Sequence, residues 1–206
     1  TIEECRALEL AGCYAPRWEC VRVAEDFHTG QLRNVRLLGD IYIGSNSYIS
    51  DSTIANYHIG DNCIIDSVLR MECRHRSSFG EGVEVAAVNE NNGRKAIIYR
   101  ELDAQTAYLM TMMRNRAEAT DALLRMAKER SEAHASEIGI VEDEVSIMGV
   151  RFIREVKIEQ GAHIEGASLL EKGTVGTNSR IGIDVRARHF ILDNNAKVDG
   201  AASIER

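Results

Sequence analysis

The sequence has few aromatic residues and no long apolar run. Aromatic side chains make up 5% of its 206 residues although 44% are hydrophobic, so we expect a core of stacked aliphatic side chains. No window approaches the roughly 20 apolar residues of a membrane-spanning helix, and the acidic start Thr1-Ile2-Glu3-Glu4 is unlike that of a signal peptide. These absences predict a cytoplasmic protein without a membrane span.

Metal-binding and disulfide patterns are also missing. The five cysteines are odd in number and include no Cys-x-x-Cys pair, so we expect reduced thiols, with neither a disulfide framework nor a cysteine zinc site. The six histidines are far apart in the sequence, at positions 28, 58, 75, 134, 163 and 189. Because no close pair of histidines offers zinc ligands, the sequence predicts no metal site.

Positive charge is not in excess. The 25 basic and 32 acidic side chains give a net charge of −7, which argues against nucleic acid or an anionic membrane as the main partner. A Walker loop, a Ser-His-Asp signature and a glycine-rich pyrophosphorylase loop are absent as well. The sequence therefore carries no signature of a nucleotidyltransferase.

What the sequence does contain is an aliphatic residue at every fifth or sixth position, beginning with Ile43, Ile49, Ile54, Ile59 and Ile65. The periods of an α-helix and of a plain strand would both scatter these residues over several faces. Short strands that each turn one aliphatic side chain inward, joined by polar turns with Gly, Asp or Asn, account for the spacing. The same step returns at Ile147, Ile153, Ile158, Ile164, Leu169 or Leu170, Val175 and Ile181.

The two runs resemble the hexapeptide-repeat, left-handed β-helix superfamily. Near copies of one step carry the resemblance: Ile59-Gly60-Asp61-Asn62, Val175-Gly176-Thr177-Asn178 and Ile181-Gly182-Ile183-Asp184. The resemblance implies a mainly β fold, a left-handed parallel β-helix in which three short strands make one coil. It also implies a homo-oligomer, commonly a trimer with sites between the subunits.

A helical segment separates the two runs. Residues 101–135 lack Gly and Pro and are rich in helix-forming residues, and Arg114-Asn115-Arg116 divides them into a predicted helical hairpin. We expect an N-terminal helix and strand cap, a first β-helix block, a turn with the helical insertion, and a second β-helix block, at 1–33, 34–88, 89–137 and 138–206. This order resembles an uncharacterised family of larger bacterial hexapeptide-repeat proteins, so we expect a fragment of a longer protein.

The resemblance implies acyl transfer from coenzyme A or acyl carrier protein, as co-substrate, to a nucleotide sugar or related small molecule. Such a reaction needs a general base, usually His. His58, in Asn56-Tyr57-His58-Ile59-Gly60-Asp61, is the candidate catalytic residue because the flanking amides and carboxylate could orient its imidazole. His163 occupies an equivalent step, which favours a packing role for both. The alternative function is a non-catalytic solenoid that serves as a binding or oligomerisation scaffold.

A ligand pocket is expected where segments project from the stack, because a straight solenoid has flat faces. The crease between the inserted helices and the coils is the predicted pocket. Arg74, His75, Asn89, Glu90 and Arg94 are its expected substrate-binding residues. Guanidinium groups suit phosphate, and amides suit a sugar or pantetheine-like group. No tightly bound cofactor is expected.

Two alternatives and one further cluster stay open. The charged run at 70–78 also fits a solvated loop, and the crease could instead be packed shut by Tyr108, Met110 and Met113. Near the end of the chain, His189 follows Arg186 and Arg188. This basic trio could hold a nucleotide phosphate.

Overall fold

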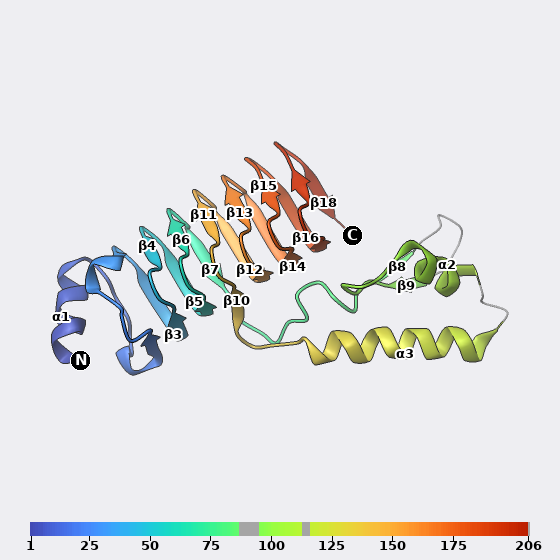
Figure 1. The fold of residues 1–206 in the computed structure, drawn as a ribbon, viewed down its shortest axis with the longest axis horizontal. Helices are drawn as coiled ribbons and strands as arrows, with labels where there is room; N and C mark the ends of the chain where they lie inside the picture. The colour runs from blue at the N-terminus through green and yellow to red at the C-terminus, as the bar shows by residue number, and fades with distance from the viewer. Residues whose placement is uncertain (87–94, 113–115, 206) are drawn as a thin grey trace.

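The chain is mainly β. A computed structural model describes residues 1–86, 95–112 and 116–205, and most of its strands form two parallel sheets that run along one stack (Figure 1). The prediction of a mainly β fold with parallel strands is confirmed. None of the described helices is long and apolar enough to cross a membrane.

The larger sheet places strands in the order β1, β3, β5, β10, β12, β14, β16 and β18, with β7 beside β5 and β12. Its strands are β1 (Val21–Val23), β3 (Arg36–Ile43), β5 (Thr53–Ile59), β7 (Arg70–Glu72), β10 (Gly139–Val141), β12 (Phe152–Ile158), β14 (Leu169–Val175), β16 (Arg186–Leu192) and β18 (Ser203–Glu205). The first half of β5 pairs with β7, and its second half pairs with β10. Strands β7 and β10 therefore share one layer of the stack although some 65 residues separate them.

The second sheet follows the same order along the stack, from β2 to β17. Its strands are β2 (Leu32–Arg33), β4 (Tyr48–Ser50), β6 (Ile64–Asp66), β11 (Ser146–Met148), β13 (His163–Glu165), β15 (Arg180–Ile181) and β17 (Lys197–Val198). Ile49 pairs with Ile65, and Ile147 pairs with both Ile65 and Ile164. Aliphatic residues one layer apart thus lie directly over one another.

The predicted inward aliphatic residues form the core. From Ile43 to Ile181, all the isoleucines and the valine named above for the two runs are at most 2% exposed. They belong to one continuous cluster that spans the residues before and after the inserted segment. Burying each such apolar side chain stabilises the fold by about 1.5–3 kcal/mol, and this burial is the main force that holds the stack together.

The N-terminal end is covered by helix α1 (Ile2–Leu10) and two 3₁₀ turns, η1 (Trp18–Cys20) and η2 (Thr29–Gln31). A capping box starts the helix, because the Thr1 hydroxyl accepts a hydrogen bond from the Glu4 N–H and the Glu4 side chain bonds back to Thr1. Leu8 is buried against the first layer, and Trp18 packs on the same core. The helix therefore closes apolar surface that the first strands would otherwise expose.

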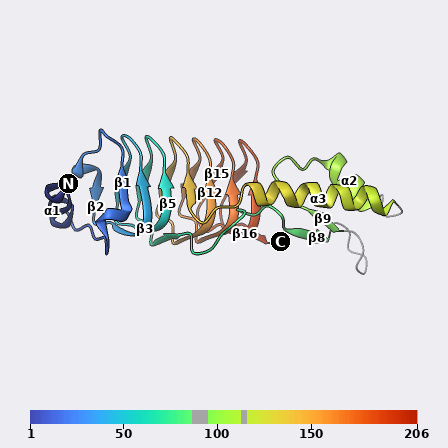
Figure 2. The ribbon, with the colours of Figure 1, turned by 90° about the horizontal axis from the view of Figure 1, so that it is seen from below.

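An arm projects from the layer that β7 and β10 share. It contains helices α2 (Ala104–Met112) and α3 (Ala117–Ala133), and both lie in the segment predicted to be helical. It also contains the antiparallel strands β8 (Glu84–Ala86) and β9 (Lys95–Ile97). The arm has its own small core around Ala96, Tyr99, Met110 and Ala127. Both views show it extending past the end of the stack near β18 (Figures 1 and 2).

Candidate active site

Close contacts hold the foot of the arm together and against the stack; the foot comprises residues 77–82 and 134–136. Ser77 and Ser136 exchange two hydrogen bonds, of 2.8 and 2.9 Å, which bring the outgoing and returning chain together. The Thr174 hydroxyl on β14 donates to the Phe79 carbonyl at 2.7 Å. Gly80 packs so closely that a Cβ there would lie 2.5 Å from the Phe190 carbonyl oxygen. Only glycine fits this approach, since φ is also +91°.

A pocket of about 300 Å³ lies in the crease between this foot and the stack. Its polar lining comes from four places: the foot of the arm, the segment after β9, the end of β12 with the residue that follows it, and β14. These supply Ser78, Glu81 and His134, then Arg100 and Glu101, then Lys157 and Glu159, and Thr174. The cavity therefore lies at the foot of the arm, next to the end of α3, and several polar groups converge in it.

The imidazole of His134 is oriented by a carboxylate. His134 follows the last turn of α3, and its Nδ1 lies 3.2 Å from Oε2 of Glu81, whose side chain is 9% exposed. A carboxylate only accepts hydrogen bonds, so Nδ1 carries the proton in this pair. In neutral His134 the Nε2 atom is then the unprotonated nitrogen, which is the arrangement of a general base.

The remaining charges in the crease neutralise one another. Arg100 donates two parallel hydrogen bonds to Glu159, of 2.9 and 2.6 Å, and one of 2.6 Å to the side-chain oxygen Oδ1 of Asn194. Lys157 lies 3.1 Å from Glu142 and 3.3 Å from Glu159. Such a bidentate pair with little solvent exposure fixes the position of both partners.

These contacts shift two pKa values. Burial favours neutral Glu159, but the hydrogen bonds from Arg100 and the charge of Lys157 outweigh it, so the pKa of this carboxyl is lowered. Burial also disfavours the Lys157 ammonium, but the hydrogen bond and charge of Glu142 more than compensate and raise its pKa. Both groups are therefore charged at neutral pH.

His58, the residue predicted to be catalytic, contacts other groups. It lies on β5 with Nε2 3.1 Å from Nη2 of Arg22 and 3.5 Å from Oδ1 of Asp40. The guanidinium can only donate, so in this contact the Nε2 lone pair is already engaged. Hydrogen bonds from Arg22 outweigh desolvation and lower the pKa of Asp40. The three side chains form a surface cluster near the N-terminal end of the stack.

The residues predicted to bind substrate are only partly described. Arg74 and His75 lie together next to the foot of the arm, where they line a hollow of about 330 Å³ with Arg76 and Glu137. The Arg74 Nε is 2.9 Å from Oε2 of Glu72, so its charge is paired. This hollow is a neighbour of the crease pocket and shares none of the lining residues given for it.

The other predicted lining residues, Asn89, Glu90 and Arg94, lie outside the described residues. Met113, one of the side chains considered for closing the crease, lies outside them too. Met110 is buried in the core of the arm, and Tyr108 is 61% exposed. Neither lines the crease pocket.

Sequence reasoning missed Glu81 and His134. They are 53 positions apart and become neighbours only because the arm returns to its starting point. A sequence signal existed, since Glu81 stands between two glycines at the exit from the first block and His134 ends the predicted helical segment. Among the described residues, no group of three or more His, Cys, Asp or Glu side chains could hold a metal ion.

Two comparisons place the chain among proteins without an assigned activity. Residues 45–206 match the family model described as "Domain of unknown function (DUF4954)". An uncharacterized protein of Treponema pallidum (strain Nichols) is 22% identical over 214 residues, which cover 84% of this chain and 30% of that protein. The chain thus spans less than a third of the length of this relative.

Proposed function

The chain belongs to the family described as Domain of unknown function (DUF4954), and from its site we propose an acyltransferase whose active site is the crease pocket. The acyl donor is the thioester of coenzyme A or acyl carrier protein. The acceptor is an amine or hydroxyl of a nucleotide sugar or related small molecule. The observation that carries the proposal is the Glu81–His134 pair, a carboxylate-oriented imidazole in a cavity.

The finer fold proposed here is the left-handed hexapeptide-repeat β-helix. Its support is a set of residues with positive φ that recur in successive layers at three positions, which fits a coil with three corners. One row has Asn46, Asn62, Glu144, Gly161, Asn178 and Asn195; another has Asn56, Glu155, Lys172 and His189; the third has Asn34, Asp51, Ser67, Gly149, Gly166, Asp184 and Ala201. Asn and Gly predominate in the first row because they tolerate this backbone conformation best.

The reaction proceeds by direct transfer. Nε2 of His134 removes the proton from the acceptor amine or hydroxyl as this group attacks the thioester carbonyl carbon. A C–N or C–O bond forms, the C–S bond breaks, and the thiolate leaves with the proton that His134 returns. Glu81 stabilises the transient imidazolium. The Lys157 ammonium has three N–H donors, and the one that faces neither Glu142 nor Glu159 donates to the developing oxyanion.

An assay of thiol release tests the proposal, with acetyl-coenzyme A as donor and amine-bearing nucleotide sugars as acceptors. His134→Gln should lower turnover by about 10²- to 10⁴-fold, the usual contribution of a general base. His163→Gln is the matched control, because His163 is also partly exposed and lies 3.6 Å from a carboxylate, but belongs to β13 away from the crease. It should keep wild-type turnover.

His58→Gln separates this proposal from the one made on sequence alone. We expect wild-type turnover, since His58 contacts Arg22 and Asp40. If His58→Gln loses turnover and His134→Gln keeps it, the general base is His58 and not His134. If no donor is turned over, the non-catalytic scaffold is the better description. The homotrimer implied by the resemblance stays a prediction, which light scattering can check.

A further inference from the structure

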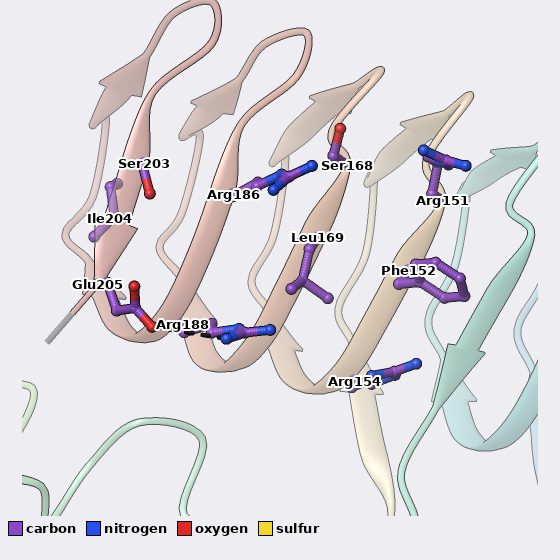
Figure 3. Close-up of a pocket in the computed structure, with 10 residues that line it drawn as sticks. All are labelled: Arg151, Phe152, Arg154, Ser168, Leu169, Arg186, Arg188, Ser203, Ile204 and Glu205. Atoms are coloured by element: carbon purple, nitrogen blue, oxygen red, sulfur yellow. Dashed lines mark ion pairs between the residues drawn. The ribbon is translucent and has the colours of Figure 1, made fainter.

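A second concave surface lies on a different face, along the first halves of β12, β14, β16 and β18 (Figure 3). This arginine groove, defined by Arg151, Arg154, Arg186 and Arg188, encloses about 380 Å³. The crease pocket is lined by the second halves of β12 and β14, and the positive-φ residues Glu155 and Lys172 separate the two halves. The groove is therefore distinct from the proposed active site.

Strand register brings the arginines together. Arg154, Glu171, Arg188 and Glu205 pair in sequence across β12, β14, β16 and β18. Two positions earlier, Phe152, Leu169, Arg186 and Ser203 pair in the same way. Alternate residues of a strand point to the same side, so both rows project outward, while Ile153, Leu170 and Ala187 between them are buried.

The two rows differ in charge compensation. In the row that starts at Arg154, basic and acidic residues alternate, and Arg188 lies 3.2 Å from Glu171 and 3.7 Å from Glu205. In the other row Arg186 has only Leu169 and Ser203 as cross-strand neighbours. Within the described part of the chain, neither Arg186 nor Arg151 forms an ion pair. Both are exposed and available to an anion.

Arg154 is incompletely satisfied as well. Its Nε is buried without a hydrogen bond, as is Oε1 of Glu72, and the two atoms are 3.5 Å apart. Glu72 is 2% exposed, and its other oxygen is taken by Arg70 and Arg74 at 2.6 and 2.9 Å. A buried polar group without a partner is costly. An anion that draws the Arg154 guanidinium into a better geometry would lower this cost.

Between the arginines the floor of the groove is apolar. The Phe152 ring and the Leu169 side chain are half-buried. Leu169 lies in the middle of the groove, and Phe152 lies at its β12 end between Arg151 and Arg154 (Figure 3). The Arg154 guanidinium sits 5.0 Å from the centre of the Phe152 ring. A ligand that fits such a surface carries both negative charge and a flat apolar group.

We propose that the arginine groove binds a nucleoside diphosphate or a molecule built on one. The diphosphate lies between Arg151 and Arg186, whose forked donors match phosphate oxygens. The base lies on Phe152 and Leu169, and Arg154 borders both parts. Long nucleic acids are disfavoured by the net charge of −7. The proposal does not depend on acyl transfer in the crease.

Calorimetric titration with adenosine diphosphate tests the groove, with inorganic pyrophosphate as the comparison. We expect adenosine diphosphate to bind more tightly, because only it covers the apolar floor. Arg151→Gln and Arg186→Gln should each weaken its binding about tenfold or more, as expected for loss of a charge-assisted contact worth about 1.5–3 kcal/mol.

Arg180→Gln is the matched control, because Arg180 is an exposed arginine on β15 of the second sheet. It should bind adenosine diphosphate like the wild type. Unchanged binding in both groove variants overturns the proposal, and so does an equal loss in Arg180→Gln, since that result indicates attraction to surface charge in general. Equal affinity for pyrophosphate and adenosine diphosphate overturns the assignment of the base to Phe152 and Leu169.

Discussion

At the scale of single residues, large rings in one layer fill space left by glycine in the next. A Cβ on Gly139 would lie 2.2 Å from Cζ of Tyr57, and a Cβ on Gly173 would lie 2.4 Å from the Phe190 ring. Tyr57 pairs with Gly139, and Phe190 pairs with Gly173. Each glycine therefore admits an aromatic ring where the aliphatic stack would otherwise leave no room.

Tyr57 also links the strands before and after the arm. Its hydroxyl donates to the Val156 carbonyl at 2.9 Å and accepts from the Val156 N–H at 3.1 Å, although 99 positions separate the two residues. The side chain is completely buried, and this burial raises the pKa of the phenol so that it stays neutral. The hydroxyl satisfies two backbone groups that have no access to water.

Tyr57→Phe should lower the free energy of unfolding by about 1–3 kcal/mol, the cost of leaving buried partners unsatisfied. Urea denaturation followed by circular dichroism measures the change. Tyr48→Phe is the control, because Tyr48 is 51% exposed and its hydroxyl can bond to water; it should change stability by less than about 0.5 kcal/mol. Equal effects of the two substitutions would contradict the role given to the Val156 contacts.

At the scale of elements, the arm is attached to the stack by a few contacts at its foot. The arm contributes Phe79, which is 2% exposed, and Arg100, which binds Glu159 on the segment after β12. Most other apolar contacts of the arm are with itself. The position of the crease pocket therefore depends on a small number of polar contacts.

Arg100→Gln should weaken this attachment by about 1–3 kcal/mol, because a buried charge-assisted pair loses one partner. The effect should depend on pH. Folding lowers the pKa of Glu159. The ion pair therefore stabilises the folded state at pH values above the pKa of an unfolded glutamate, about 4.3. This contribution is lost as the pH falls through the lower pKa that Glu159 has in the folded protein. Urea unfolding of wild type and variant should thus differ at pH 7 and converge well below pH of about 4.

Arg33→Gln provides the control for Arg100→Gln. Arg33 and Asp51 form an ion pair at 3.2 Å, but their side chains are 72% and 42% exposed. Solvent screening keeps such pairs weak, so this substitution should change stability little at any pH. A difference between wild type and Arg100→Gln that stays constant down to acid pH would show that lost packing, and not the charge of Glu159, is responsible.

At the scale of the whole molecule, one aliphatic core connects the layers on both sides of the arm. Ile158 is fully buried and pairs with Val141 in one neighbouring layer and with Val175 in the other. Since each layer rests on the next, damage at one central position removes support from strands that lie far apart in the sequence.

Ile158→Asp should unfold the stack, because an unpaired buried carboxylate costs several kcal/mol. Ile183→Asp makes the same chemical change at a residue that is 60% exposed, and it should leave the melting temperature within a few degrees of wild type. Thermal melts by circular dichroism compare the two. A folded Ile158→Asp variant with a wild-type melting temperature would show that the core does not depend on the stacked residues Val141, Ile158 and Val175.

The sequence by itself determined the inward aliphatic residues, the polar turns and the helical segment, because each depends on spacing and composition within a few residues. Asn46, Asn62 and Asn178 lie at turns with φ of 52°, 56° and 55°, as expected for polar turn residues.

Only the tertiary structure decided which side chains meet. Strands β7 and β10 share a layer, so the chain returns to its starting point and His134 reaches Glu81. Likewise Arg151 and Arg186 line one groove because two layers of stacking bring them together. Contacts of this kind depend on the register between strands distant in sequence, and no local pattern in the amino acids reports that register.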